Sequence, residues 1–152
     1  HTGRFTKFRT GWLDMPDDIP RFPFGFGLGY GQVGYGAPRL SQDSAGADQT
    51  VELRVMLENT GPAEAIETVQ LYASDPVARV TRPGRSLIDF QQVALAAGES
   101  CQVVFSIRAE QFAYPVAPSF QTAEWVRDPG LIRLHVGPNS RDTQTVDLTW
   151  RN

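Results

Sequence analysis

Cysteine is almost absent from this sequence, and long runs of apolar residues are missing altogether. Cys101 is the only cysteine, so no disulfide can form within the chain, and a Cys-x-x-Cys metal or redox site is excluded. Because Cys101 begins the inward set of a strand pattern, we interpret it as an inert core thiol. No apolar run approaches the roughly 18 residues of a membrane span, and no segment resembles a signal peptide.

Clustered positive charge is also absent. The 14 lysine and arginine residues are scattered singly along 152 residues, and the formal net charge is −3. Nucleic acid and anionic lipid surfaces are bound through basic stripes or polybasic patches, which this chain does not have. We therefore expect neither nucleic acid nor a membrane as a partner.

Histidine is scarce as well, which limits the catalytic chemistry that the sequence can indicate. Of the two histidines, His1 is terminal and His135 lies between Leu134 and Val136 in a strand pattern. Because the two neighbours are expected to point inward, His135 is predicted to face solvent. No local pattern singles out a Ser-His-Asp or Cys-His site, whose members meet only in space. We predict no catalytic residue, cofactor or metal.

The dominant pattern from residue 49 onward is an alternation of apolar and polar residues, with turn residues every 8–12 positions and no convincing long helix. Residues 109–114 suggest one helical turn, ended by Pro115. The pattern predicts an all-β Greek-key β-sandwich of the immunoglobulin or fibronectin type III kind with about seven strands. The predicted strands cover residues 51–57, 69–73, 87–95, 101–107, 122–126, 132–136 and 146–150.

The first 29 residues do not follow the strand spacing. They form an irregular leader with an aromatic cluster, which is costly to leave in water and should pack against a neighbour. We therefore divide the chain into a leader, 1–29, and a sandwich, 30–152. Since the chain opens with His1 rather than methionine, we expect it to be part of a longer polypeptide. The aromatic cluster consists of Phe5, Phe8, Trp12, Phe22, Phe24 and Phe26.

Part of this leader, FPFGFGLGYG, alternates apolar side chains with residues that are nearly all glycine. An extended chain would place the apolar side chains on one edge and let another backbone approach the other edge. Each interior glycine costs about 0.5–1 kcal/mol relative to alanine, whereas each buried phenylalanine or leucine returns about 1.5–3 kcal/mol. We predict a seam that docks the sandwich onto a preceding domain; covering the sandwich's own open end is the alternative. The docking candidates are Phe22, Phe24, Phe26, Leu28 and Tyr30.

Two other candidate motifs give little indication of function. The GxGxxG match at residues 29–34 is followed by Tyr-Gly-Ala-Pro, which cannot begin the helix that a dinucleotide site needs. Most acidic residues lie in turns or at outward strand positions, so no carboxylate pair of glycosidase type stands out. Asp14, beside Trp12, is either a capping acceptor or a polar group facing a neighbouring site.

Seven stretches in order resemble the C-terminal end of family 3 glycoside hydrolases, above all β-glucosidases. The match runs from residue 2 to about residue 140, and the ordered set is far more specific than any single stretch. The stretches are Thr2-Gly3-Arg4 with Trp12-Leu13-Asp14, the segment FPFGFGLGY at residues 22–30, Glu58 to Gly61, Val69 to Tyr72, Arg82 to Phe90, Leu95 to Glu99, and Pro129-Gly130 leading to His135-Val136-Gly137.

The resemblance implies that residues 30–152 are a non-catalytic fibronectin type III-like domain that braces the preceding catalytic domains of the same polypeptide. It also implies that residues 1–29 are the tail of the preceding α/β sandwich domain together with the aromatic, glycine-rich connector. The catalytic residues of that family belong to those other domains, so none is carried over. Trp12 and Asp14 would lie near the active-site rim, and carbohydrate would be met only through the parent enzyme. Two alternatives remain: a carbohydrate-binding module stacking sugars on aromatic residues, and a cell-surface adhesion module. The aromatic residues are Trp12, Tyr35, Tyr72 and Trp125.

Overall fold

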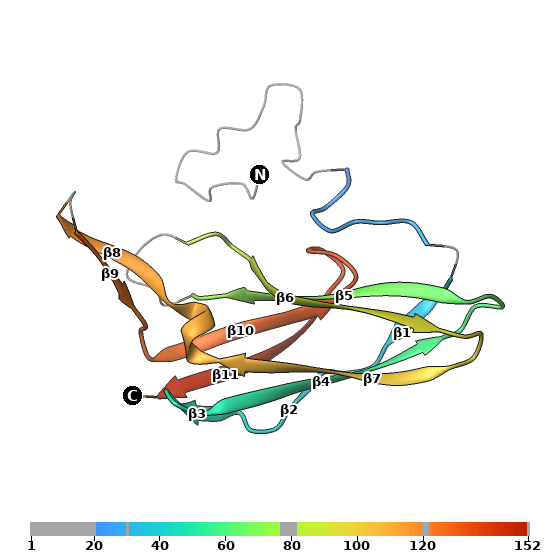
Figure 1. Ribbon diagram of the computed structural model, residues 1–152, viewed down its shortest axis with the longest axis horizontal. Coiled ribbons are helices and arrows are strands. Elements are labelled where there is room, and N and C mark those ends of the chain that lie inside the picture. Colours follow the sequence, from blue (N-terminus) through green and yellow to red (C-terminus); the bar gives the residue numbers. More distant parts are fainter. Residues whose placement is uncertain (1–20, 30, 77–81, 120–121, 152) are drawn as a thin grey trace.

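A computed structural model describes residues 21–29, 31–76, 82–119 and 122–151. Two β-sheets pack face to face, and a two-stranded hairpin projects from one end of the pair (Figure 1). This architecture confirms the predicted all-β sandwich. In the described ranges, no helix is long and apolar enough to cross a membrane.

The strands are distributed over three sheets. In the first sheet, β4 pairs with β1 and β2 on one side and with β7 on the other. The second sheet has the order β3-β11-β10-β5-β6, and β8 pairs with β9 in the projecting hairpin. The elements are β1 (Val33–Tyr35), β2 (Arg39–Leu40), β3 (Ser44–Gly46), β4 (Thr50–Asn59), β5 (Ala65–Ser74), β6 (Ser86–Leu95), β7 (Ser100–Arg108), the 3-10 helix η1 (Ala109–Phe112), β8 (Tyr114–Ser119), β9 (Thr122–Val126), β10 (Gly130–Gly137) and β11 (Gln144–Arg151).

All seven predicted strands are present, as β4 to β7 and β9 to β11. The sequence did not indicate β1, β2 and β3, which are two or three residues long and too short to show a period. The prediction for residues 109–114 was only partly right. The helical turn ends at Phe112, and Pro115 lies inside β8 rather than after a helix. A proline is tolerated there because a two-stranded ribbon consists of edge strands only.

The core lies between the two sheets and follows the predicted alternation. In β4, Val51, Leu53, Val55 and Leu57 are fully buried, while the residues between them face outward. The inward sets of β5, β7, β10 and β11 meet them from the other strands. Cys101 is only partly buried and packs against this core, and burial raises the pKa of its thiol, in accord with an unreactive cysteine.

The end of β4 is fixed by a buried asparagine. The side-chain amide of Asn59 donates to the carbonyls of Ala63, Leu95 and Ala96 at 2.7, 3.0 and 3.1 Å. Its Oδ1 accepts from the backbone N–H of Gly61 at 3.0 Å. One side chain therefore ties the β4–β5 turn to the end of β6, where the chain crosses between the sheets.

We expect Asn59→Ala to lower the free energy of unfolding by about 2–4 kcal/mol, because buried carbonyls and one N–H lose their partner. Urea unfolding monitored by tryptophan fluorescence would measure the loss. Glu58→Ala is the matched control, since Glu58 is the exposed neighbour on the same strand, and it should change stability by less than about 0.5 kcal/mol. Equal effects of the two substitutions would contradict the assignment.

Candidate functional site

Residues 21–29, the connector, lie across the outer face of the five-stranded sheet before the chain continues into β1 (Figure 1). The side-chain amide of Gln70 in β5 donates to the carbonyl of Gly25 at 3.1 Å and to that of Pro138 at 2.6 Å. The backbone N–H of Ser140 donates to the carbonyl of Phe24 at 2.9 Å. The connector is therefore bound through its own backbone, and it buries outward-facing Gln70 and Tyr72.

The connector is not extended throughout, so the strict two-residue alternation predicted for it is wrong. The N–H of Phe26 donates to the carbonyl of Pro23 at 3.1 Å, which closes a turn over Phe24 and Gly25. Gly25 has a φ of +78°, and an added Cβ would lie 2.0 Å from Oε1 of Gln70. The glycine serves both the left-handed turn position and the close approach to β5.

The turn decides where the docking candidates point. Phe22 and Phe26 have ring centroids 5.1 Å apart, and Phe24 meets the buried ring of Tyr72 edge-on at 6.4 Å. Even so, Phe22 and Phe24 are 63% and 67% exposed, and Phe26 and Leu28 are exposed as well. Pro23, which the sequence did not single out, is the buried residue of the connector. The docking role of Phe22, Phe24, Phe26 and Leu28 stays a prediction.

Three of the predicted site residues, Trp12, Asp14 and Tyr30, lie outside the described residues. Of the four aromatic residues considered for sugar stacking, Tyr72 is buried, and Tyr35 is half-buried and donates to Glu67 at 2.7 Å. Trp125 stands exposed on β9.

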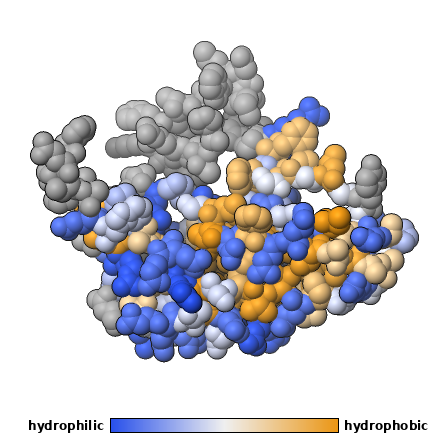
Figure 2. Space-filling view, in the orientation of Figure 1, coloured by the Kyte–Doolittle hydropathy of each residue, from blue (hydrophilic) through white to orange (hydrophobic). Residues whose placement is uncertain are grey.

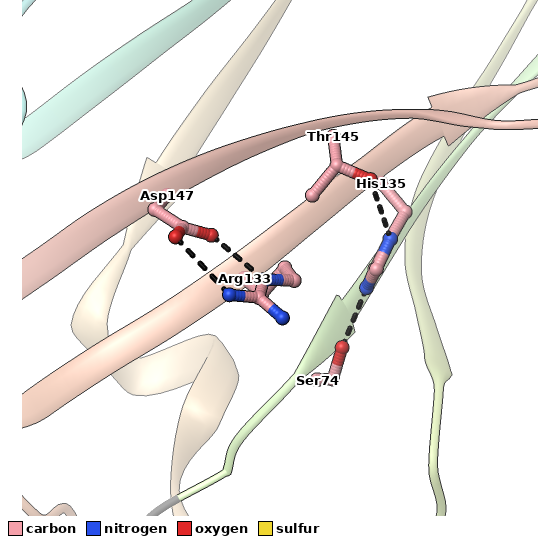
Figure 3. Close-up of polar contacts among 5 residues, drawn as sticks. All are labelled: Ser74, Arg133, His135, Thr145 and Asp147. Atoms are coloured by element: carbon pink, nitrogen blue, oxygen red, sulfur yellow. Dashed lines mark hydrogen bonds and ion pairs between the residues drawn. The ribbon is translucent and has the colours of Figure 1, made fainter.

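His135 does not face solvent, which corrects the sequence-based expectation. It lies on the outer face of β10 as the alternation requires, but only 5% of it is exposed. Its register partners Tyr72 and Thr145 flank it from β5 and β11, and the connector covers the adjacent Tyr72. Figure 3 shows the ring between two hydroxyl groups: Nε2 is 2.5 Å from Oγ of Ser74, and Nδ1 is 3.1 Å from Oγ1 of Thr145.

The electrostatics keep this imidazole neutral. Burial, and then the guanidinium groups of Arg85 and Arg133, lowers the pKa of His135 from 6.5 to about 4, while Asp147 acts in the opposite direction. Asp147 itself accepts two hydrogen bonds from Arg133, at 2.9 and 3.3 Å (Figure 3). These bonds lower the pKa of its carboxyl group. The Ser74–His135 pair therefore has a hydroxyl, not a carboxylate, as third member, and the arrangement differs from a catalytic triad.

A hollow with a volume of about 270 Å³ lies beside η1 and contains one ion pair. Arg82 reaches Asp75 at 3.3 Å, donates to the carbonyl of Phe112 at 3.0 Å and lies over the ring of Tyr114. The guanidinium is thus occupied by structural contacts. Within the described ranges, no group of three or more His, Cys, Asp or Glu side chains could hold a metal ion.

Comparison with known proteins assigns this sandwich to a known family of domains. A fibronectin type III-like domain model matches residues 67–140, which begin within β5 and extend past the end of β10. The chain is 32% identical to a β-glucosidase of Bacteroides ovatus, over 86% of this chain and 17% of that protein. It is 36% identical to a β-xylosidase of Formosa agariphila, over 91% of this chain and 19% of that protein. The chain belongs to the fibronectin type III-like domains of family 3 glycoside hydrolases.

Solved structures agree with this assignment. The fibronectin type III-like chain superposes on a β-glucosidase of Erythrobacter marinus with a TM-score of 0.84 at 34% identity, covering 99% of this chain and 19% of that one. A β-glucosidase of Listeria innocua gives a TM-score of 0.83 at 29% identity, covering 96% of this chain and 19% of that one. The chain spans less than a fifth of the length of each of these four relatives.

We expect acid to destabilise the domain through His135. Because its pKa is about 4 when folded and 6.5 ordinarily, the unfolded chain takes up the proton first as the pH falls. The contribution is complete above about pH 6.5 and is lost as the pH falls to about 4. Urea unfolding at about pH 4.5 should show a loss of roughly 1–3 kcal/mol from this group.

His135→Gln provides the control for this pH dependence, because glutamine offers polar atoms to Ser74 and Thr145 but does not titrate. The variant should lack this part of the acid-induced loss. If both proteins lose stability equally between neutral and acid pH, His135 does not carry the effect.

Proposed function

We propose that this domain is a non-catalytic brace within a longer β-glucosidase-type enzyme, here called the parent. The parent would hydrolyse terminal β-linked sugars with retention, through a covalent glycosyl-enzyme. The observation that carries the proposal is a comparison of lengths. The matches extend over 86–99% of this chain, but they cover only 17–19% of the β-glucosidases and the β-xylosidase compared with it. The catalytic residues would then lie in the remaining four-fifths of the parent.

The described carboxylates support a non-catalytic role. A glycosidase of this kind needs two carboxyl groups across the scissile bond, one of them with a raised pKa. Here Asp147 is paired with Arg133, Asp75 with Arg82, and Glu67 accepts from Tyr35. The pKa of Asp147 is lowered, which is the opposite of what a general acid requires.

The connector supports the bracing role. Its backbone is held by Gln70 and Ser140, yet the rings of Phe22 and Phe24 remain mostly exposed. Exposed phenylalanines on a fixed support suit a contact with the preceding domains of the parent. In this proposal Tyr30 belongs to the same seam, Trp12 and Asp14 lie near the active-site rim, and carbohydrate contacts the parent rather than this domain.

Sugar binding by the domain itself is the second candidate, and the exposed indole of Trp125 is the observation that favours it. Calorimetric titration of the isolated domain with cello-oligosaccharides separates the two proposals. The bracing proposal expects no heat of binding, whereas saturable heat that Trp125→Ala abolishes would establish a sugar site.

The bracing proposal predicts that this chain alone leaves a chromogenic β-glucoside intact, while the parent hydrolyses it. In the parent, the double substitution Phe22→Ser and Phe24→Ser should lower the melting temperature by several degrees, because each ring loses a buried partner surface. In the isolated chain the same substitutions should lower the melting temperature less, because only the two ring pairs within the chain are lost. Turnover by this chain alone, or equal shifts in both proteins, would contradict the proposal.

A further inference from the structure

The outer face of β5 and β6 carries no charged side chain over four consecutive cross-strand pairs. By the register, Ile66 lies opposite Ala94, Thr68 opposite Gln92, Gln70 opposite Phe90 and Tyr72 opposite Leu87. Ile66 is 64% exposed, Phe90 is 61% exposed, and Leu87 is exposed too. We call Ile66, Leu87 and Phe90 the β5–β6 patch. The solvent-facing side of a sheet usually carries polar and charged residues, whereas the centre of an interface is depleted of charged residues.

A β-bulge in β6 is what places two of these side chains on the same face. Leu87 and Phe90 are three residues apart, so a regular strand would point them to opposite faces. The register shifts between Leu71 and Tyr72, and β6 has one extra residue there. Ile88 packs against the core, while Leu87 and Phe90 both face outward. The local backbone thus exposes Phe90 instead of burying it, and bulges commonly re-aim side chains in this way.

The rest of the same outer face is different. Its β10–β11 half carries the exposed ion pair of Arg133 with Asp147 and is suited to water. The four uncharged β5–β6 pairs lie beside the connector, because Gly25 and Phe24 contact Gln70 and Tyr72, the register partners of Phe90 and Leu87, while Arg85, just before β6, is held by Ser140 and Thr143. Figure 2 shows hydrophobic residues gathered on the β6 side of the sandwich and, above them, on the connector.

We propose that the β5–β6 patch and the connector phenylalanines form one continuous docking surface for the rest of the parent polypeptide. The inference rests on the bracing function proposed above and extends it from the connector to β5 and β6. The surface is then an apolar centre of phenylalanine, leucine and isoleucine side chains, with the Arg133–Asp147 pair at its polar rim. Its occupant presents an apolar surface without charge at the centre.

The occupant of the patch is the parent itself and not a second copy of this chain, because the parent is covalently linked to this domain. The domain accounts for less than a fifth of the relatives' length, so most of such a polypeptide lies outside it. The connector itself passes beside the patch, because Gly25 and Phe24 contact the register partners of Phe90 and Leu87. A tethered surface reaches an effective concentration in the millimolar range, which a free second copy does not match. The connector's fixed backbone also keeps the span between tether and patch short.

Hydroxyl-radical footprinting of the whole parent and of this chain alone tests the proposal. We expect oxidation of Phe90, Leu87 and Ile66 to be at least about fivefold slower in the parent, because water is excluded from an interface centre. Oxidation of Met56 and Trp125 provides the matched control: both are exposed apolar residues, on β4 and β9. Their rates should be the same in the two proteins.

The possible outcomes separate this inference from the bracing function. If the connector phenylalanines are protected in the parent but Phe90 and Ile66 are not, the inference is wrong while the bracing function stands. If neither group is protected, both fail. If Phe90 is protected in the isolated chain and the protection increases with protein concentration, a second copy occupies the patch and the inference is overturned.

A substitution pair gives an independent measurement. Phe90→Thr should lower the melting temperature of the parent by several degrees but leave that of the isolated chain nearly unchanged, since the ring has few contacts within the domain. Met56→Thr, the control, should have the same small effect in both proteins. An equal effect of Phe90→Thr in parent and isolated chain would contradict docking at the patch.

Discussion

The hydrogen bonds of Gln70 determine how this domain presents its surface. One amide in β5 binds carbonyls from the connector and from the segment after β10, so that three parts of the chain meet at one point. Because Gln70 is buried, breaking these bonds would leave polar groups without water. The connector therefore cannot leave the sheet without exposing Gln70 and Tyr72. Its path across the outer face, and with it the position of its aromatic rings, follows from this constraint.

The same arrangement separates the two tasks of the connector. Its backbone and the buried Pro23 contact the sandwich, while the rings of Phe22 and Phe24 stay mostly exposed. The edge-on contact of Phe24 with Tyr72 and the pair of Phe22 with Phe26 stabilise these rings only in part, since such pairs contribute about 0.5–1.5 kcal/mol. Most of their apolar surface would gain by burial against a partner. A fixed support with unburied rings is what docking requires.

Much of the fold could be predicted from the sequence, because the alternation of Val51, Leu53, Val55 and Leu57 directly reflects a strand with one buried face. His135 shows where that reasoning stops. Alternation gives the face of the sheet but not what covers that face, and the connector's contact with β5 is not visible in the local pattern. The turn at Gly25 was missed for a similar reason, since glycine fits both an extended ribbon and a left-handed turn. The docking role of the candidates in the connector stays a prediction, and the sequence could not give the directions of their side chains.

The β5–β6 patch shows the reverse case, in which a local signal was present but could be interpreted only with the register. The segment SLIDFQQVAL contains one charged residue, Asp89, and its period-two pattern breaks between Leu87 and Phe90. From sequence alone, residues 87–95 are predicted as one apolar-rich strand, with no indication of a bulge. Paired with β5, the break is a bulge that turns an additional apolar residue outward while Ile88 keeps the core filled. In the docking proposal, the exposed Phe90 and the uncharged pairs around it lie at the centre of one contact with the parent, so the bulge and the absence of charge support the same surface.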